Sequence, residues 1–393
     1  MIPMRVVHLC NLPLPLEHPD RGRISLHPGR WVLNLALAQR QHADIDARLV
    51  VQVPGSRHDY GTEIEGVPVH FVAAPDKLRS ATLFVPDVLR LRKAVLAEHP
   101  DLVHAHGTED AYALSAQACG KPYLITAQGC FFIINRELPP RLVSRDRIVQ
   151  LTEWVALRRA KHVIAKSAYV RDELARAFPH LAIHEIPNTI DPRLLEIPLD
   201  RERESGSLAF VGTVVPRKGV HLIAAALAIL QRGDSDVFAR IALSVFGDRP
   251  GQESDYETTC KKRLRDLLGE RVSFYGTIPA IEVAEALSRT DLLLAPSLEE
   301  MFGNQFIEAL AVGADAIVSG GTAMAENARR LRAGRVVTRD DAAALAGAIR
   351  DAVVSPITLS ERIERRKKLA GFVGPEAVAL AHRKVYEQVR GGA

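Results

Sequence analysis

The stretch from Leu292 to Glu326 constrains the fold of this chain more than any other. It opens with a short apolar run, Leu292 to Ala295, which a proline ends. A helix is predicted to begin around Gly303, and a second apolar run covers Ala314 to Val318. Short, continuous apolar runs are typical of strands that are buried on both faces. The order strand, loop, helix, strand therefore predicts one right-handed crossover between parallel strands.

The loop inside this crossover carries two candidate ligand-binding carboxylates, Glu300 and Glu308. Between them, the amides of Gly303 to Gln305 stand at a helix start, where N–H groups lack helical partners and attract anions. A carboxylate accepts hydrogen bonds from sugar or ribose hydroxyls without a shifted pKa. We therefore expect the loop to hold a phosphorylated, hydroxyl-rich ligand. The alternative, two solvent-facing helix residues, stays open, and spacing alone does not make them a glycosidase pair.

Strands and helices alternate along the whole chain in two series. The predicted strands are 5–10, 47–53, 67–72, 101–105, 122–127 and 162–166 in the first series, and 208–211, 241–246, 272–275, 292–295, 314–318 and 335–338 in the second. This alternation predicts an α/β fold with a doubly wound parallel sheet in each half. A proline-rich and charged segment lies between the halves. Ligands of such sheets bind at the carboxyl ends of the strands, so the cleft between the halves is the expected site.

The domain boundaries follow from this pattern. We place an N-terminal domain at 1–190, a linker at 191–206, a C-terminal domain at 207–370, and at 371–393 a final helix that packs back on the N-terminal domain. Two domains of this size can each build a core.

Composition and charge narrow the class of protein. The chain is 47% hydrophobic and 25% charged, with a net charge of +4, which is typical of a globular protein and shows no basic stripe for nucleic acid. The four cysteines form no CxxC pair, so reduced thiols in the cytoplasm are expected. No apolar stretch reaches the roughly 18 residues that span a bilayer. Any membrane contact is therefore expected to be peripheral, on the inner face.

A second candidate ligand site is the turn GTVVPRKG, from Gly212 to Gly219. Gly212 ends a predicted strand, and Arg217 and Lys218 stand at the start of the next helix. Two cations beside free amides suit a diphosphate. The order GxxxxGK[ST] is absent, so this is not the phosphate loop of nucleoside triphosphatases. A solvated turn with ordinary surface cations is the alternative.

Histidines concentrate in the sequence HAHG, at His104 and His106. No ligand spacing supports a metal, and we predict none. The two side chains point to the same side of a strand. We expect them to act as hydrogen-bonding groups in the cleft.

The motif PSLEEMFGNQFIEALAVGADAIVSGG resembles the signature of retaining nucleotide-sugar glycosyltransferases of family four. Weaker matches to the same family, in order along the chain, are DLVHAHG, PNTID, GTVVPRKG, FGD and SFYG. The resemblance implies the GT-B fold, in which two Rossmann-like domains face each other across a cleft. It also implies transfer of a hexosyl group from a UDP-, GDP- or ADP-sugar to an acceptor hydroxyl of a glycan, glycolipid or small molecule. Retention of configuration and independence of metals and other cofactors are further implications.

The resemblance also assigns roles to individual residues. Glu300 and Lys218 match the catalytic pair, of which the glutamate contacts the donor sugar and the lysine stabilises the departing diphosphate. Glu308 matches the glutamate that binds the ribose hydroxyls. The other donor-binding positions are Gly29, Gly212, Arg217, Phe302, Gly303, Asn304 and Gln305. The acceptor-side candidates are His106 and Gln128.

Three positions depart from the family pattern. Thr213 stands where an arginine is usual, with Arg217 as a possible substitute, and Gln128 stands where a histidine is common. Asn188-Thr189 replaces the usual asparagine-glycine pair. The departures at Thr213 and Gln128 leave open a catalytically impaired sugar-nucleotide-binding protein. A nucleotide-sugar epimerase of the same fold is a second, separate alternative. The sequence names neither the base, which backbone groups around 276–278 are expected to contact, nor the sugar or the acceptor.

The most basic part of the first half is the stretch 135–161. It is a candidate docking face for an anionic membrane or a lipid-linked acceptor. In that case the family habit points to bacterial polysaccharide biosynthesis. An ordinary arginine-rich surface helix is the alternative.

Overall fold

A computed structural model describes residues 3–15, 17–20, 29–77, 79–108, 111–134 and 145–392. The chain forms two compact units: unit 1 contains residues 1–189 and 373–393, and unit 2 contains residues 190–372. Residues 191–206, placed in a linker by the sequence, lie within unit 2. There Arg203 donates a hydrogen bond to the carbonyl oxygen of Val312 at 2.7 Å.

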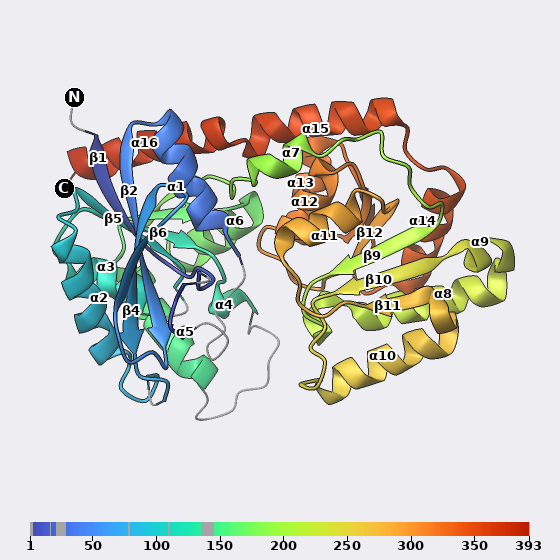
Figure 1. Cartoon of the computed structure of the whole chain (residues 1–393), viewed down its shortest axis with the longest axis horizontal. Helices are drawn as coiled ribbons and strands as arrows, with labels where there is room; N and C mark the ends of the chain where they lie inside the picture. The colour runs from blue at the N-terminus through green and yellow to red at the C-terminus, as the bar shows by residue number, and fades with distance from the viewer. Residues whose placement is uncertain are drawn as a thin grey trace. The chain divides into compact units, whose positions relative to one another are not determined.

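The described part of unit 1 contains one sheet (Figure 1). Its strands are β1 (Met4–Cys10), β2 (Ile45–Pro54), β3 (Tyr60–Ile64), β4 (Val67–Ala74), β5 (Leu102–His106), β6 (Tyr123–Ala127), β7 (His162–Ala165) and β8 (Ala182–Glu185). They lie in the order β3-β4-β2-β1-β5-β6-β7-β8. All pairs are parallel except β3 with β4. The sequence did not predict β3 and β8, because β3 is half exposed and β8 has no apolar run.

Helices cover both faces of this sheet. They are α1 (Trp31–His42), α2 (Val85–Ala97), α3 (Tyr112–Ala118), α4 (Phe131–Ile134), α5 (Arg145–Arg159), α6 (Ala168–Ala177) and the C-terminal α16 (Pro375–Gly391). Helix α16 packs against α1. Its side chains Val378, Val385 and Tyr386 are buried in one core with residues of α1 and β1. The last helix of the chain is thus part of the core of unit 1.

The sheet of unit 2 is parallel throughout and has the strand order β11-β10-β9-β12-β13-β14. These strands are β9 (Ser207–Val211), β10 (Ala242–Phe246), β11 (Val272–Phe274), β12 (Leu292–Ala295), β13 (Asp315–Ser319) and β14 (Arg335–Val337). Strands β12 and β13 pair directly and are buried along their whole length. This confirms the crossover that the apolar runs predicted.

The helices of unit 2 lie on both faces of its sheet (Figure 1). They are α7 (Pro192–Glu196), the 3-10 helix η1 (Pro216–Lys218), α8 (Val220–Gly233), α9 (Ser235–Arg240), α10 (Asp255–Leu268), the 3-10 helix η2 (Gly269–Arg271), α11 (Ala280–Leu287), α12 (Asn304–Ala311), α13 (Ala323–Leu331), α14 (Ala342–Val354) and α15 (Leu359–Val373). Helices α8, α9, α10 and α14 share one apolar core. Each unit is therefore a doubly wound sheet, as predicted.

Within the described ranges, no single helix is both long and apolar enough to cross a membrane. One pair, Ala342–Val354 with Leu359–Gly391, meets the criteria of length and composition only when taken together, with a bend of 120° between its members.

Candidate functional site

Three glycines follow the neighbouring strands β9, β10 and β11 of unit 2: Gly212, Gly247 and Gly276, all with positive φ. A Cβ atom on Gly247 would lie 2.8 Å from the backbone of Gly212. Gly247 also donates its N–H to the carbonyl oxygen of Gly276 at 2.7 Å. The three chain segments that leave the sheet here are thus packed backbone to backbone. This leaves a sheet edge with few side chains, of the kind that α/β folds use for phosphates.

The turn after β9 is held tightly against the loop after β12. Gly219 immediately precedes α8 and has φ 73°, and a Cβ atom there would lie 2.1 Å from the carbonyl oxygen of Pro296. Leu298 donates its N–H to the carbonyl oxygen of Arg217 at 2.7 Å. Only glycine permits this approach. The approach places the turn that carries Lys218 beside the loop that carries Glu300.

Lys218 and Glu300 form the central ion pair of this site. Lys218 Nζ lies 2.5 Å from Glu300 Oε2, and the two side chains are 12% and 14% exposed. Gln305 Nε2 donates to the same carboxylate oxygen at 3.2 Å. Among the described residues, Glu300 Oε1 has no hydrogen bond and Lys218 Nζ has no second partner. An ammonium carries three donors, so both groups retain capacity for a ligand.

The ionisation of Glu300 follows from its neighbours. Burial acts to raise the pKa of Glu300, but Lys218, Gln305 and Arg217 together hold that pKa below its ordinary value. The carboxyl group of Glu300 is therefore ionised at neutral pH. The pair offers a cation to an anionic ligand and a carboxylate to hydroxyl groups within one small region.

Gly303 immediately precedes helix α12 and lies three residues after Glu300. Gly303 has φ 84°, and a Cβ atom there would lie 2.1 Å from Met324 Cγ. No side chain caps the helix start, so the first-turn amides of α12 are a ready anion site. The glycine is required both by its backbone conformation and by the close packing of Met324.

Glu308 lies one turn further along α12 and is partly buried. Burial, and then the negative charge of Asp191, raise the pKa of Glu308 to about 7. Its carboxylate makes no hydrogen bond to any described residue. Asp191 caps helix α7, because its carboxylate accepts a hydrogen bond from the N–H of Arg193 at 3.1 Å. Helix α7 in turn packs on α12. Within the described ranges, Glu308 is thus a carboxyl group whose hydrogen-bonding capacity is unused.

Other predicted positions of unit 2 differ in what they can offer a ligand. The side chain of Phe302 is 2% exposed, and its carbonyl oxygen accepts a hydrogen bond from Asn327 Nδ2 at 2.9 Å. Phe302 therefore packs in the core of unit 2, and its donor-binding role stays a prediction. Thr213 and Arg217 are both exposed. Arg217 is nevertheless close enough to act on the pKa of Glu300.

Asp248 organises the same sheet edge, although no role was predicted for it. Its side chain is 2% exposed. One carboxylate oxygen accepts from the N–H of Gly276 at 2.6 Å, and the other accepts from Lys261 Nζ at 2.8 Å. Asp248 thereby ties the segment after β10 to the segment after β11. The sequence signal that could have identified Asp248 is the glycine-aspartate pair directly after a predicted strand.

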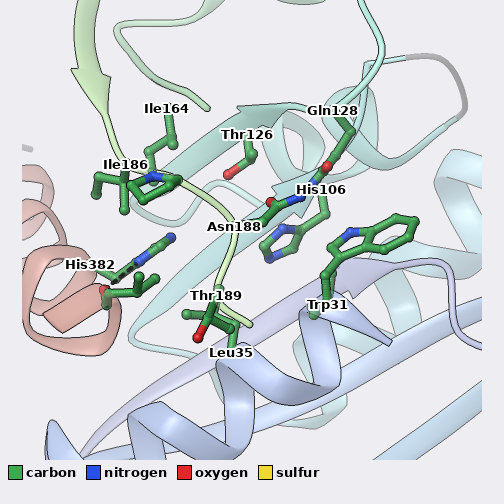
Figure 2. A pocket seen from close by; sticks show the side chains of 13 residues that line it. Trp31, Leu35, His106, Thr126, Gln128, Ile164, Ile186, Asn188, Thr189 and His382 are labelled. Carbon is green, nitrogen blue, oxygen red and sulfur yellow. Dashed lines mark hydrogen bonds between the residues drawn. The ribbon is translucent and has the colours of Figure 1, made fainter. Parts of the chain in front are cut away.

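Unit 1 has a pocket of its own at the carboxyl ends of β5 and β6 (Figure 2). Helix α1, the segment 186–189 and helix α16 complete its wall. The polar and aromatic lining residues are Trp31, His106, Thr126, Gln128, Asn188, Thr189 and His382. The indole of Trp31 and the imidazole of His106 both face the pocket in Figure 2. An aromatic face beside several hydrogen-bonding groups suits a small polar ligand.

Gly29 supports this pocket. A Cβ atom on Gly29 would lie 1.6 Å from the indole ring of Trp31. The ring therefore covers the Gly29 backbone, and a larger residue would displace it. Gly29, His106 and Gln128 belong to unit 1, whereas the other predicted site residues belong to unit 2.

The two acceptor-side candidates, His106 and Gln128, line the same pocket. Gln128 Oε1 accepts a hydrogen bond from Lys166 Nζ at 2.7 Å. Lys166 is buried and directly follows β7. The sequence did not single out Lys166; a lysine at the end of an apolar strand was the signal that could have found it.

His8, His104 and His106 form a buried cluster in which one ring nitrogen from each residue lies within 4.8 Å of the other two. Such a group could in principle hold a metal ion. Within the described chain, however, every ring nitrogen of the three except His106 Nδ1 already has a hydrogen-bond partner. A metal would have to replace several of these bonds. The cluster is therefore best described as a hydrogen-bonded network.

Comparison with known protein families gives the decisive observation. Residues 28–194 match the family described as Glycosyltransferase Family 4, and residues 205–354 match the family described as Glycosyl transferases group 1. The chain belongs to the glycosyltransferases of the family-four type. Each matched range falls almost entirely within one of the two units.

The individual relatives share little sequence identity with this chain. The chain is 26% identical over 396 residues to D-inositol 3-phosphate glycosyltransferase 1 of Catenulispora acidiphila, which covers 96% of this chain and 94% of the relative. It is 28% identical over 295 residues to 2-deoxystreptamine N-acetyl-D-glucosaminyltransferase of Streptomyces fradiae, which covers 70% of this chain and 66% of the relative.

Solved structures establish the fold. Sucrose-phosphate synthase from Thermosynechococcus elongatus matches with a TM-score of 0.79 at 20% identity, covering 99% of this chain and 100% of that one. Anabaena Alr3699/HepE, solved in complex with UDP and glucose, matches with a TM-score of 0.64 at 16% identity, covering 99% and 98%. This glycosyltransferase therefore has the GT-B fold.

Proposed function

We propose that the protein is a retaining hexosyltransferase that uses a nucleoside diphosphate sugar as donor and needs no metal. The observation that carries the proposal is the partly buried ion pair of Lys218 and Glu300 beside the uncapped start of α12. A diphosphate needs positive charge and N–H donors, and a hexose needs hydroxyl partners. This region of unit 2 supplies both.

The residues of unit 2 divide the donor between them. The remaining donors of Lys218 Nζ, with Arg217 beside it, bind the diphosphate and stabilise its charge as it departs. Glu300 Oε1 accepts from the hexose hydroxyls, and the amides at the start of α12 contact the donor near the phosphate. Glu308 accepts from the ribose hydroxyls.

The reaction then breaks the bond between the anomeric carbon and the diphosphate oxygen. The acceptor oxygen forms its bond to the same face of the anomeric carbon, and the departing phosphate oxygen takes the hydroxyl proton. No protein nucleophile is needed in this route. The cations and the helix start supply the charge stabilisation that a divalent metal gives in other transferases.

The pocket of unit 1 is the proposed acceptor site. Its aromatic wall and its hydrogen-bonding groups suit a small polyhydroxylated molecule. Two relatives carry names with such acceptors, D-inositol 3-phosphate and 2-deoxystreptamine. Both compounds therefore belong in an acceptor panel, together with hexoses and lipid-linked sugars.

A peripheral membrane contact through α5 is part of the proposal for lipid-linked acceptors. Leu151 and Trp154 of this helix are exposed at 54% and 44%, and Arg158 lies over the Trp154 ring. An exposed aromatic with neighbouring arginines suits an anionic bilayer surface on the cytoplasmic side. Two members of the predicted basic stretch, Arg136 and Arg141, lie outside the described residues. Vesicle sedimentation with and without anionic lipid, compared with Trp154→Ala, tests the contact.

The deciding experiment incubates the protein with UDP-, GDP- and ADP-hexoses and the acceptor panel in the presence of a chelator. Nucleotide release that depends on the acceptor, with an axial anomeric bond carried from donor to product, is expected. Conversion of the donor sugar without any acceptor would indicate an epimerase instead. Donor binding by calorimetry with no turnover on any acceptor would indicate a non-catalytic binding protein.

A further inference from the structure

The pocket of unit 1 is backed by an unusual run of buried polar side chains. His8, His104, His106 and Thr126 stand on strands β1, β5 and β6, on the face that α1 and α16 cover. His106 and Thr126 are direct register partners, as are His8 and His104. Gln39 of α1 and Tyr386 of α16 complete the set. All six are buried.

These six side chains form one unbranched chain of hydrogen bonds. It runs from His106 Nε2 to His8 Nδ1 at 2.9 Å and from His8 Nε2 to Gln39 Oε1 at 2.9 Å. Gln39 Nε2 then donates to Tyr386 Oη at 2.9 Å. Beyond the tyrosine, the chain continues to His104 Nδ1 at 2.7 Å and from His104 Nε2 to Thr126 Oγ1 at 2.7 Å. Both of its ends, His106 and Thr126, line the pocket.

The amide of Gln39 sets the direction of every bond toward His106. Its oxygen can only accept, so His8 Nε2 carries the hydrogen. Burial first, and the nearby His382 second, lower the pKa of His8 to about 3, so the ring is neutral and its Nδ1 accepts. His106 Nε2 therefore donates. Burial also holds the pKa of His106 well below its ordinary value, which leaves a lone pair on Nδ1.

The same amide also sets the direction of the hydrogen bonds between Gln39 and Thr126. Its nitrogen donates to Tyr386 Oη, and the buried hydroxyl gives its own hydrogen to His104 Nδ1, since leaving that hydrogen unpaired is costly. Neutral His104 then donates from Nε2 to Thr126 Oγ1. The hydroxyl hydrogen of Thr126 is not used in this series of hydrogen bonds. It is free to be donated into the pocket.

The two ends are therefore complementary. Among the described residues, His106 Nδ1 has no hydrogen-bond partner although the side chain is only 5% exposed. Reversing the Gln39 amide would reverse every hydrogen bond on both sides of Gln39, so that His106 would donate and Thr126 would accept. One end always donates and the other always accepts, because both are tied to one amide. A hydroxyl group, which donates one hydrogen bond and accepts another, matches this pair.

We propose that Gln39 and Tyr386 are positioning residues that polarise the unit 1 pocket for a hydroxyl group of a neutral polyol. In the orientation observed, His106 Nδ1 accepts the hydrogen of the ligand hydroxyl and Thr126 donates to its oxygen. His382 adds a second acceptor, since its Nδ1 donates to the carbonyl oxygen of Val378 at 2.8 Å and its Nε2 carries the lone pair. The inference rests on the proposed function only in taking this polyol as the sugar acceptor.

The proposed directions of the hydrogen bonds fix the tautomer of each histidine. These tautomers are tested on the full-length protein, labelled with 15N at histidine, by long-range 1H–15N correlation spectra of the imidazoles. The expected result is that His8, His104 and His106 share the Nε2–H tautomer while His382 carries its hydrogen on Nδ1. Tyr386→Phe should release His104 into a mixture of tautomers and leave His8 and His106 unchanged. The matched control is Tyr123→Phe, whose hydroxyl bonds to Arg159 outside the network; it should change none of them. Different tautomers among the three histidines of the unsubstituted protein would overturn the proposal.

The ligand class is tested with free inositol and glucose as probes. Binding should move the His106 Nδ1 resonance, and Thr126→Val should weaken binding about tenfold, with recovery in Thr126→Ser. If neither polyol moves the His106 resonance, the assignment of the ligand is wrong. Neither measurement requires glycosyl transfer. A protein with the expected tautomers and polyol binding, but without transfer, would count against the proposed function alone.

Discussion

The ammonium of Lys218 lies 2.5 Å from the carboxylate of Glu300, although 82 positions separate the two residues in the chain. The contact exists because Gly219 lets the start of α8 approach the carbonyl oxygen of Pro296. Each residue sits at the carboxyl end of its own strand, β9 or β12, and these strands are neighbours. The pair is therefore a product of sheet topology as much as of the two side chains.

Glu300→Ala should abolish hexosyl transfer while sparing nucleotide binding. The carboxylate is proposed to contact only the hexose, and its loss leaves Lys218 free for the diphosphate. Glu300→Gln keeps the shape without the charge and should reduce turnover by about 10²-fold or more. Lys218→Ala should instead lower both binding and turnover. Calorimetry with the nucleotide and an acceptor-dependent release assay separate these effects; full transfer by Glu300→Ala would refute the role given to Glu300.

Nucleotide binding near pH 7 should release a proton from Glu308. Burial and Asp191 raise the pKa of Glu308 to about 7 in the free protein, and hydroxyl donors from ribose favour the ionised form. Affinity should therefore fall as the pH drops below 7. In the free protein the sign is opposite: the raised pKa stabilises the fold below the ordinary pKa of 4.5 and this contribution is lost as the pH rises through 7.

Calorimetry in two buffers of different ionisation enthalpy measures this proton directly. Glu308→Gln should bind the nucleotide more weakly and release no proton. Asp191→Asn keeps the helix cap of α7 but removes the negative charge, so it should reduce the proton release and keep the binding. Equal heats in both buffers for the unsubstituted protein would show that Glu308 does not titrate on binding.

Gly219→Ala should destabilise unit 2 and disable the site together. The residue has φ 73°, and a Cβ atom would lie 2.1 Å from a backbone oxygen that cannot move aside as a side chain could. A loss of about 2 kcal/mol or more of unfolding free energy is expected. Gly347→Ala, in an open position within α14, is the matched control and should be neutral or stabilise by up to about 1 kcal/mol. Equal urea midpoints for the two variants would contradict the close-approach argument.

Unit 1 should lose stability steeply below pH 6.5. Burial lowers the pKa of His8 to about 3 and that of His382 to about 4, and it holds those of His104 and His106 well below 6.5. The unfolded chain takes up these protons first, so the stabilisation present above pH 6.5 is lost as the pH falls. Each histidine contributes about 1.4 kcal/mol per pH unit in this range.

The fluorescence of tryptophan reports this transition, because Trp31 and Trp154 are the only tryptophans of the chain and both lie in unit 1. Urea unfolding at several pH values between 7.5 and 5.5 gives the slope. His382→Leu should make the slope shallower by about one proton. A midpoint that stays constant over this range would show that the buried histidines do not control stability.

The sheet positions were predictable wherever strands are buried on both faces. Leu292 to Ala295 and Ala314 to Val318 form continuous apolar runs, and the structure has β12 and β13 there. Strand β3 was not predictable from such runs, since its alternate residues face solvent and it pairs antiparallel at the sheet edge. Its stability comes from β4 rather than from its own sequence.

The candidate site also combines features that were predictable from local sequence with features that were not. The sequence by itself determined the two doubly wound sheets, because the alternation of strands and helices is a local pattern. It also determined which positions carry the glycines at the close backbone contacts. The motifs placed the cation of Lys218 and the carboxyl groups of Glu300 and Glu308 in the site. Only the tertiary structure decided that Phe302 is core, that Asp248 ties two strand ends together, and that His106 is joined to Tyr386 through Gln39. These features depend on contacts between residues far apart in the chain, and the sheet order that creates those contacts is a property of the whole fold.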